Sequence, residues 1–310
     1  MIDDNSKEFI KRHIGPTEEE QSKMLKYVGY KSLQDLMENT VPEKILLKEE
    51  LKIDQPMSEN DALKKLKSIS KKNKIFRNFI GMGYYNSITP NVILRNILEN
   101  PGWYTSYTPY QPEVAQGRLE MLLNFQQSII DLTGMDIANA SLLDEATATA
   151  EAVGLSQRLD KTDSKKIFIS SNCNPQTIDL IKTRTNPFGL ELIIGNEKTE
   201  LTKIDEDIIC GVLSYPGTLG EINDPSESIS QIHKKNGKAI LVCDLLALAR
   251  LKTPAELGAD IAVGSAQRFG IPMGFGGPHA AFFATKEEFK RSMPGRIIGV
   301  SKDRHGKKAY

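Results

Sequence analysis

The chain has 310 residues, enough for one large domain or two ordinary ones with a sizeable core. Its 40 Lys and Arg residues balance its 40 Asp and Glu residues, and this zero formal charge argues against a nucleic-acid-binding protein. The sequence has no run of about 18 apolar residues that could span a membrane. Residues 1–15 are charged and show no secretory signal, so a soluble cytoplasmic protein is expected.

The three cysteines, Cys173, Cys210 and Cys243, are far apart and lack the CxxC spacing of zinc or redox sites. Two of them lie in apolar runs typical of buried strands. We therefore expect buried free thiols, which suit a reducing compartment. Because the sequence also has no cluster of histidines, a metal site is not expected.

Residues 1–75 are polar and helical in pattern, and they are predicted to form a helical N-terminal extension. Thr17 followed by Glu20 is a capping-box pattern at the start of one helix. Ser58 and Asp61 repeat this pattern ahead of a lysine-rich helix, whose charges indicate a solvated face.

From about residue 76 to residue 110 the chain carries its only Trp, several Tyr, and Gly and Pro at turn positions. This stretch is too rich in turn residues for a regular element, so we expect an ordered loop near a contact surface. Residues 113–133 then have helical spacing and end at Gly134, and the alanine-rich residues 144–159 predict a second helix.

Beyond residue 165, short apolar runs alternate with helical patterns. Helices are expected at residues 174–185 and 224–237. Strands are expected at residues 166–170, 190–194, 208–214, 239–243, 260–263 and 279–284. This alternation predicts βαβ units, so residues 76–310 are expected to form one α/β domain with a mostly parallel sheet covered on both faces.

Ligands of open α/β sheets bind at the carboxyl ends of the strands. Asp244 ends the strand at 239–243, where an acid could keep the pyridine nitrogen of pyridoxal phosphate (PLP) protonated. It could equally cap the segment that follows. The glycine-rich residues 274–278 precede a strand rather than a helix, which disfavours a phosphate-binding dinucleotide loop.

Three further polar features have simple structural interpretations. Glu113 and Arg118 could form a salt bridge on one helix face, and His279 could cap the strand that it begins. Ser265 lacks the GxSxG pattern of a hydrolase nucleophile.

Long segments of the chain resemble the N-terminal half of the glycine decarboxylase P-protein family of the glycine cleavage system. They are RHIGPTEEE (12–20), GMGYYNSITP (81–90), NPGWYTSYTPYQPEVAQGRLE (100–120), NASLLDEATATAEA (139–152), GFGGPHAAFFA (274–284) and PGRIIGVSKDRHGKKAY (294–310). Thr149 departs from the alanine most often found there. The resemblance implies an aminotransferase-like PLP-dependent large domain of fold type I, in an enzyme of two homologous halves that are fused or separate.

In the catalytic half of that family, a segment resembling HKTFCIPHGGGGP carries the lysine that binds PLP covalently. This chain has AQRFGIPMGFGGP, with Gln267 at the lysine position. An amide has no nucleophilic amine, so Gln267 cannot form an imine. Lys252 and Lys286 do not match the motif. We therefore expect a chemically silent half without covalent PLP, in which Asp244 is a vestigial cofactor position.

The resemblance also places loops of one half in the active site of the other. The candidates to line the partner active site are Tyr84, Tyr85, Asn86, Ser87 and Thr89. The phenols would line the glycine pocket, and a hydroxyl would contact cofactor phosphate; alternatively, the two tyrosines pack an interface. The weaker candidates, expected to serve packing, are Trp103, Tyr104, Tyr107 and Tyr110.

By resemblance, the complete enzyme decarboxylates glycine with PLP held by the other half and passes the aminomethyl group to the lipoyl arm of the H-protein. The implied partners are the C-terminal half or subunit 2 in a heterotetramer, with the T-protein and dihydrolipoyl dehydrogenase as system members. The resemblance also implies a small C-terminal domain, which is expected to be missing from this sequence. The chain is therefore expected to be a fragment, inactive and poorly soluble alone.

Two alternatives remain open from the sequence. The first is a self-sufficient PLP enzyme that uses Lys252 or another lysine. The second is a non-enzymatic scaffold that binds the catalytic half without shaping its site.

Overall fold

The computed structural model describes residues 12–13, 15–49, 51–274 and 279–310. It divides the chain into two compact units, Met1–Asn78 and Phe79–Tyr310. The domains predicted at 1–75 and 76–310 remain a prediction, since compactness does not show that either unit folds by itself. The first 11 residues and most of the glycine-rich turn (275–278) lie outside the described residues. No helix in the described part of the chain is long and apolar enough to cross a membrane.

The first unit contains helices whose ends match the capping residues in the sequence. They are α2 (Glu18–Val28), α3 (Leu33–Thr40) and α4 (Glu59–Ser70). Thr17 and Glu20 form the predicted capping box at α2. The Ser58 hydroxyl accepts from the backbone N–H of Asp61 at the start of α4, as predicted.

The stretch predicted to be irregular contains short helices, so that prediction was wrong in part. They are α5 (Asn91–Ile93), the π-helical turn η1 (Leu94–Leu98) and α6 (Pro101–Tyr104), and the 3-10 turn η2 (Pro112–Val114) follows this stretch. The prolines lie at the first helical positions or just before them, where a missing N–H costs no intrahelical bond. Helix α7 (Gln116–Thr133) begins later than predicted because Ala115 leaves the helical conformation.

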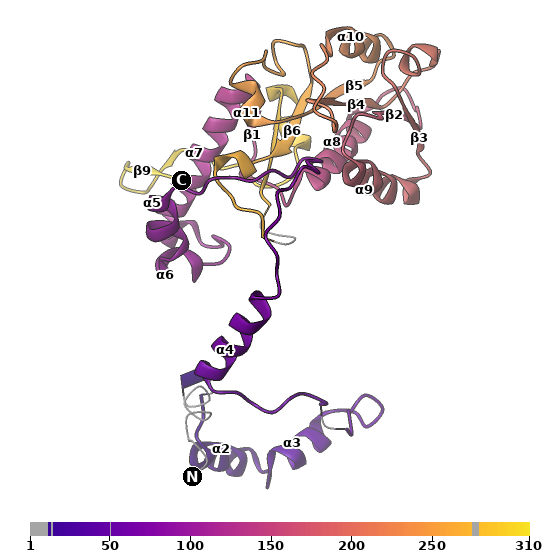
Figure 1. Ribbon diagram of the computed structural model, residues 1–310. Helices are drawn as coiled ribbons and strands as arrows, with labels where there is room; N and C mark the ends of the chain where they lie inside the picture. The colour runs from indigo at the N-terminus through magenta and orange to yellow at the C-terminus, as the bar shows by residue number, and fades with distance from the viewer. Residues whose placement is uncertain (1–11, 14, 50, 275–278) are drawn as a thin grey trace. The chain divides into compact units, whose positions relative to one another are not determined.

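The second unit is built on a seven-stranded sheet of order β1-β7-β6-β5-β4-β2-β3 (Figure 1). Its strands are β1 (Ile137–Ala138), β2 (Lys166–Ser170), β3 (Glu191–Gly195), β4 (Cys210–Tyr215), β5 (Lys238–Cys243), β6 (Ile261–Ser265) and β7 (Ala281–Thr285). The central strands pair in parallel, and β7 runs antiparallel to β6. A mostly parallel sheet of this kind is the predicted α/β architecture.

Helices connect the strands and cover both faces of the sheet (Figure 1). Besides α7, they are α8 (Glu145–Leu159), α9 (Pro175–Thr185), α10 (Ser226–Lys234) and the short α11 (Leu245–Leu248). The 3-10 turns are η3 (Asn186–Phe188), η4 (Leu201–Lys203), η5 (Gln267–Phe269) and η6 (Glu287–Ser292), and the hairpin β8 (Ser301–Lys302) and β9 (Lys308–Ala309) lies near the end.

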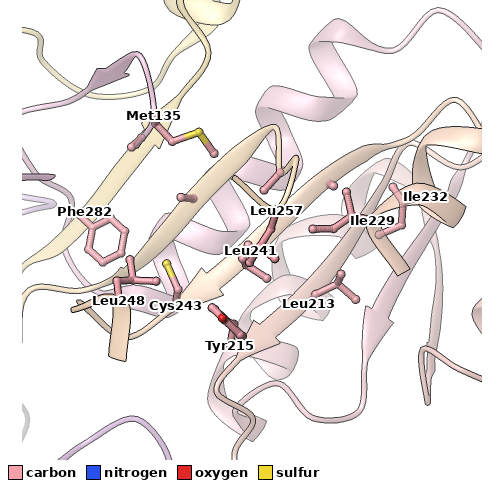
Figure 2. Packing of buried hydrophobic residues seen from close by; sticks show 14 of the residues in the cluster. Met135, Leu213, Tyr215, Ile229, Ile232, Leu241, Cys243, Leu248, Leu257 and Phe282 are labelled. Carbon is pink, nitrogen blue, oxygen red and sulfur yellow. The ribbon is translucent and has the colours of Figure 1, made fainter. Parts of the chain in front are cut away.

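Alternate residues of each strand enter different cores. In β5, Leu241 and Cys243 pack with α7, α10 and α11, whereas Ile240 and Val242 pack with α8 and α9. Figure 2 shows residues of the first of these cores, among them Leu241 and Cys243 of β5 and Phe282 of β7. Because both faces are buried, the strands are continuously apolar, which explains why they were recognisable in the sequence.

All three cysteines are free and buried, as predicted. Burial raises the pKa of each thiol, that of Cys210 to about 12. Neutral thiols of this kind serve packing rather than nucleophilic chemistry.

Helix α8 offers a test of the local determinants of the fold. The Asp144 carboxylate accepts a 2.7 Å hydrogen bond from the backbone N–H of Thr147 and caps this helix. Replacing Asp144 by alanine is expected to lower the free energy of unfolding by about 1 kcal/mol, while asparagine keeps most of the cap. Urea titrations of the two variants check this expectation, and equal losses in both would contradict it.

Candidate functional site

A small cavity of about 40 Å³ lies at the carboxyl ends of β4, β5 and β6. Parallel strands direct their carboxyl ends to one edge of the sheet, and ligands of such folds bind there. The polar residues that line the cavity include Glu145, Asn174, Asp244, Ser265, Gln267 and Arg268. Asp244 and Gln267, both candidates from the sequence, are thus brought together by the fold.

Asp244 directly follows β5 and is already engaged by two partners. Its Oδ1 accepts from the backbone N–H of Leu246 at 2.9 Å, so it caps α11. Its carboxylate also pairs with the Arg268 guanidinium in a forked arrangement, Nη2 to Oδ2 at 2.6 Å and Nε to Oδ1 at 3.0 Å. Hydrogen bonding to Asp244 and the charge of its carboxylate raise the pKa of Arg268. The capping role that the sequence left open is therefore present, together with an ion pair that the sequence did not indicate.

Gln267 begins the 3-10 turn that follows β6, and only 2% of it is exposed. Its amide Nε2 donates to the backbone carbonyl of Tyr85 at 2.9 Å, and the Tyr85 N–H donates to Oε1 at 3.4 Å. The side chain at the lysine position thus bonds both backbone groups of one residue from a distant part of the chain.

Residues 81–90, hereafter segment 81–90, follow the rim of this cavity. Ser87 Oγ donates to the carbonyl of Gln267 at 3.2 Å, and Thr89 Oγ1 donates to that of Gly270 at 2.6 Å. Gln176 Nε2 donates to the Met82 carbonyl at 2.6 Å. Several separate bonds therefore hold the segment against the sheet edge.

The tyrosine rings of segment 81–90 pack on charged and aromatic neighbours. The Tyr85 ring lies 4.3 Å from the Arg268 guanidinium carbon, within cation–π distance. The Tyr84 ring centroid is 5.0 Å from that of His279, which precedes β7. Burial and the charges of Asp144 and Glu145 raise the pKa of Tyr84, so its phenol stays protonated. Of the five predicted site residues, only Tyr85 lines the cavity, and Asn86 is exposed. Tyr84 packs on His279, and Ser87 and Thr89 bond the backbone that follows β6.

Sequence reasoning missed Arg268, Glu145 and Asn174. Glu145 is the first residue of α8, and it accepts a 2.9 Å hydrogen bond from Asn174 Nδ2. Burial raises the pKa of the Glu145 carboxyl. A signal for Arg268 was present, because the catalytic motif HKTFCIPHGGGGP has threonine where this chain has arginine beside Gln267.

The other candidates lie elsewhere. Lys286 pairs with Asp260 at 2.5 Å, at the amino end of β6 and so at the far end of that strand from the cavity. Arg118 donates to the backbone carbonyls of Trp103 and Tyr107, so the salt bridge predicted with Glu113 is replaced by contacts that fix the aromatic loop. In that loop, Trp103, Tyr107 and Tyr110 line a separate, open hollow of about 800 Å³. Tyr104, Tyr107 and Tyr110 are all largely exposed.

The cavity does not fit PLP in this arrangement. Gln267 offers no amine, and the Asp244 carboxylate is neutralised by Arg268. Its volume of about 40 Å³ is also far below the roughly 300–1,000 Å³ of ligand pockets. The cavity therefore lies where such folds bind their ligands, but the polar side chains that line it already have hydrogen-bond partners within the chain.

The sheet order, the antiparallel β7 and the cavity at the carboxyl strand ends define the large-domain fold of fold-type-I PLP-dependent enzymes. A cysteine desulfurase from Thermococcus onnurineus NA1 superposes with a TM-score of 0.51 at 14% identity, over 75% of this chain and 60% of that chain. At that identity, the likeness shows the fold alone.

The family is defined more closely. The model of the glycine cleavage system P-protein family matches residues 11–310, and the chain belongs to that family. A relative from Pelagibacter ubique (strain HTCC1062), named glycine dehydrogenase (decarboxylating), is 74% identical over 310 residues, which is all of this chain and 32% of that protein. The chain thus spans about a third of the length of such relatives.

A solved structure agrees with this assignment. The crystal structure of a glycine decarboxylase (P-protein) of the glycine cleavage system, in an inhibitor-bound form, superposes with a TM-score of 0.87 at 34% identity. The superposition covers 96% of this chain and 68% of that chain.

Proposed function

We propose that this chain is the N-terminal, cofactor-free part of a glycine dehydrogenase (decarboxylating). The complete enzyme would decarboxylate glycine and transfer the aminomethyl group to the lipoyl arm of the H-protein. PLP, held covalently by the other half, would supply the electron sink for this decarboxylation. Family membership and the 74% identical relative of that name support the proposal.

The observation that carries this proposal is the small size of the cavity and the side chains that occupy it. Gln267 lies at the lysine position and bonds the backbone of Tyr85, while Arg268 forms an ion pair with the Asp244 carboxylate. A chain that fills its own cofactor position with side chains depends on a partner for the covalent chemistry. We therefore assign PLP to the C-terminal half or second subunit, and we place the enzyme in the cytoplasm, which suits three buried free thiols.

This chain would complete the partner's active site through segment 81–90. Inner contacts to Gln267 and Gly270 hold the segment, while Asn86 and the 92%-exposed Ile88 are accessible from outside. Tyr84 and Tyr85 would order and desolvate the glycine site from its rim, and Ser87 and Thr89 would fix the backbone rather than move protons. The phenol of Tyr84, whose pKa is raised, could act as a hydrogen-bond donor and not as a base at neutral pH.

The proposal is tested by incubating the purified chain with PLP, alone and with the catalytic half, and then reducing with borohydride. We expect no reduced adduct on the chain alone, and glycine turnover only in the complex. A pyridoxyl adduct mapped by mass spectrometry to a lysine of this chain would show instead a self-sufficient PLP enzyme.

A second test of the same proposal places a lysine at position 267. We expect Gln267→Lys alone to give no reducible adduct, because Arg268 still neutralises Asp244 and the cavity is too small. Adding Arg268→Thr frees the carboxylate and is expected to permit adduct formation at position 267. An adduct with the single variant at the level of the double variant would contradict the closed-site interpretation.

A further inference from the structure

An uncommon hydrogen-bond arrangement recurs in the second unit. In three places a glutamine side chain bonds both the N–H and the C=O of one distant residue, as a neighbouring strand would. The pairs are Gln267 with Tyr85, Gln126 with Ile298, and Gln116 with Tyr310. Two of the amides hold irregular backbone, at Tyr85 and Ile298, and the third holds Tyr310, the residue that follows β9. We call this arrangement an amide clasp.

The clasp at Gln267 differs from the other two in its surroundings. The residue after it, Arg268, holds the ring of the same Tyr85 at 4.3 Å and forks onto Asp244. The carbonyl of Gln267 also accepts from Ser87. Two adjacent residues thus fix the backbone and the ring of Tyr85 and the side chain of Ser87. They do so at the place where a fold-type-I enzyme would hold its cofactor.

We propose that Gln267 and Arg268 are positioning residues, and that the former cofactor pocket now holds segment 81–90 in a single conformation. The buried amide of Gln267 and the half-buried guanidinium of Arg268 fix the inner side of the segment, so that its exposed residues, Asn86 and Ile88, meet the catalytic part of the enzyme in a defined geometry. The contact between segment 81–90 and the catalytic part of the enzyme rests on the proposed function, whereas the hydrogen bonds of the amide clasp do not.

The test uses Gln267→Met in the assembled enzyme, with Gln126→Met as the matched control. Methionine is close to glutamine in size but loses both bonds of the clasp. Losing a buried hydrogen bond shifts a local opening equilibrium by about tenfold or more. We expect backbone hydrogen exchange of segment 81–90, followed by mass spectrometry, to become about tenfold faster in Gln267→Met and to stay unchanged in Gln126→Met.

Kinetics separate positioning from general stability. In Gln267→Met, kcat/KM for glycine should fall by about tenfold, while the PLP content of the complex and the kinetics of Gln126→Met stay at wild-type values. Arg268→Lys, which keeps the charge but loses the planar fork, is expected to show the same two changes in weaker form.

Unaltered exchange of segment 81–90 in Gln267→Met, or an equal change in Gln126→Met, overturns the proposal. So does faster exchange with unchanged kinetics, because the segment's conformation would then not matter to the reaction. Failure of the proposed function is recognised separately, since the wild-type complex would then not turn over glycine at all.

Discussion

Replacing Asp260 by alanine is expected to lower the free energy of unfolding by about 2–3 kcal/mol, because it removes a buried carboxylate that pairs with Lys286 and accepts from the backbone N–H of Ala239. Asp260 is 4% exposed and lies just before β6. Its Oδ1 accepts from Lys286 at 2.5 Å, and its Oδ2 lies 2.8 Å from both His233 Nε2 and the backbone nitrogen of Ala239. The carboxylate thereby joins α10, β5 and the end of β7.

The same carboxylate makes stability depend on pH. Burial tends to raise the pKa of Asp260, but the bonds from His233, Lys286 and Ala239 outweigh it and lower the pKa to about 2. A group with a lowered folded pKa stabilises the fold above its unfolded pKa of about 3.9, and this contribution is lost as the pH falls through about 2. Its size is about 2–3 kcal/mol.

Urea unfolding from pH 7 to pH 2 measures both effects. The wild-type protein should lose this contribution between about pH 4 and pH 2, whereas Asp260→Asn should show a flatter profile there. The exposed Asp205 supplies the control, since Asp205→Asn should leave the profile unchanged. An Asp260→Ala variant within about 1 kcal/mol of wild type at pH 7 would contradict the argument.

The sheet could be predicted because its strands are buried on both faces. The run at 166–170 corresponds to β2, and the strand expected at 279–284 overlaps β7, which runs antiparallel to β6. The helical turns at 91–98 were missed because they are short and lie between Pro90 and Pro101, in a stretch that was judged by its many turn residues. A short helical run is easily overlooked when the residues that flank it favour turns.

Only part of the candidate site could be predicted from the sequence. A motif identified Gln267 and a strand end identified Asp244, since both depend on local order along the chain. The bonds between Tyr85 and Gln267 join residues 182 positions apart, and nothing in either local sequence indicates that pairing. The role of Asp244 was left open for the same reason, because Arg268, which pairs with its carboxylate, is 24 residues away in the sequence.

Gly83→Ala is expected to reduce glycine turnover of the assembled enzyme by about a hundredfold, the scale of a roughly 1 Å misplacement of a positioned group. Gly83 has a φ of +84°, which costs alanine about 1–2 kcal/mol. A Cβ there would also lie 2.6 Å from Asn174 Nδ2. Asn174 is 8% exposed and bonded to Glu145, so it cannot yield without breaking that bond.

Two further variants separate the conformational cost from the collision. Gly220 has a φ of +85° and no heavy atom within 4 Å of where a Cβ would lie, so Gly220→Ala carries the conformational cost alone and should leave turnover near wild type. Asn174→Ala added to Gly83→Ala removes the colliding amide and should recover part of the lost turnover. Equal turnover in Gly83→Ala and Gly220→Ala would mean that the place of segment 81–90 does not limit the reaction. A loss of turnover that is specific to Gly83→Ala and is relieved by Asn174→Ala would show that the reaction depends on the close packing of Gly83 against Asn174 beside the cavity.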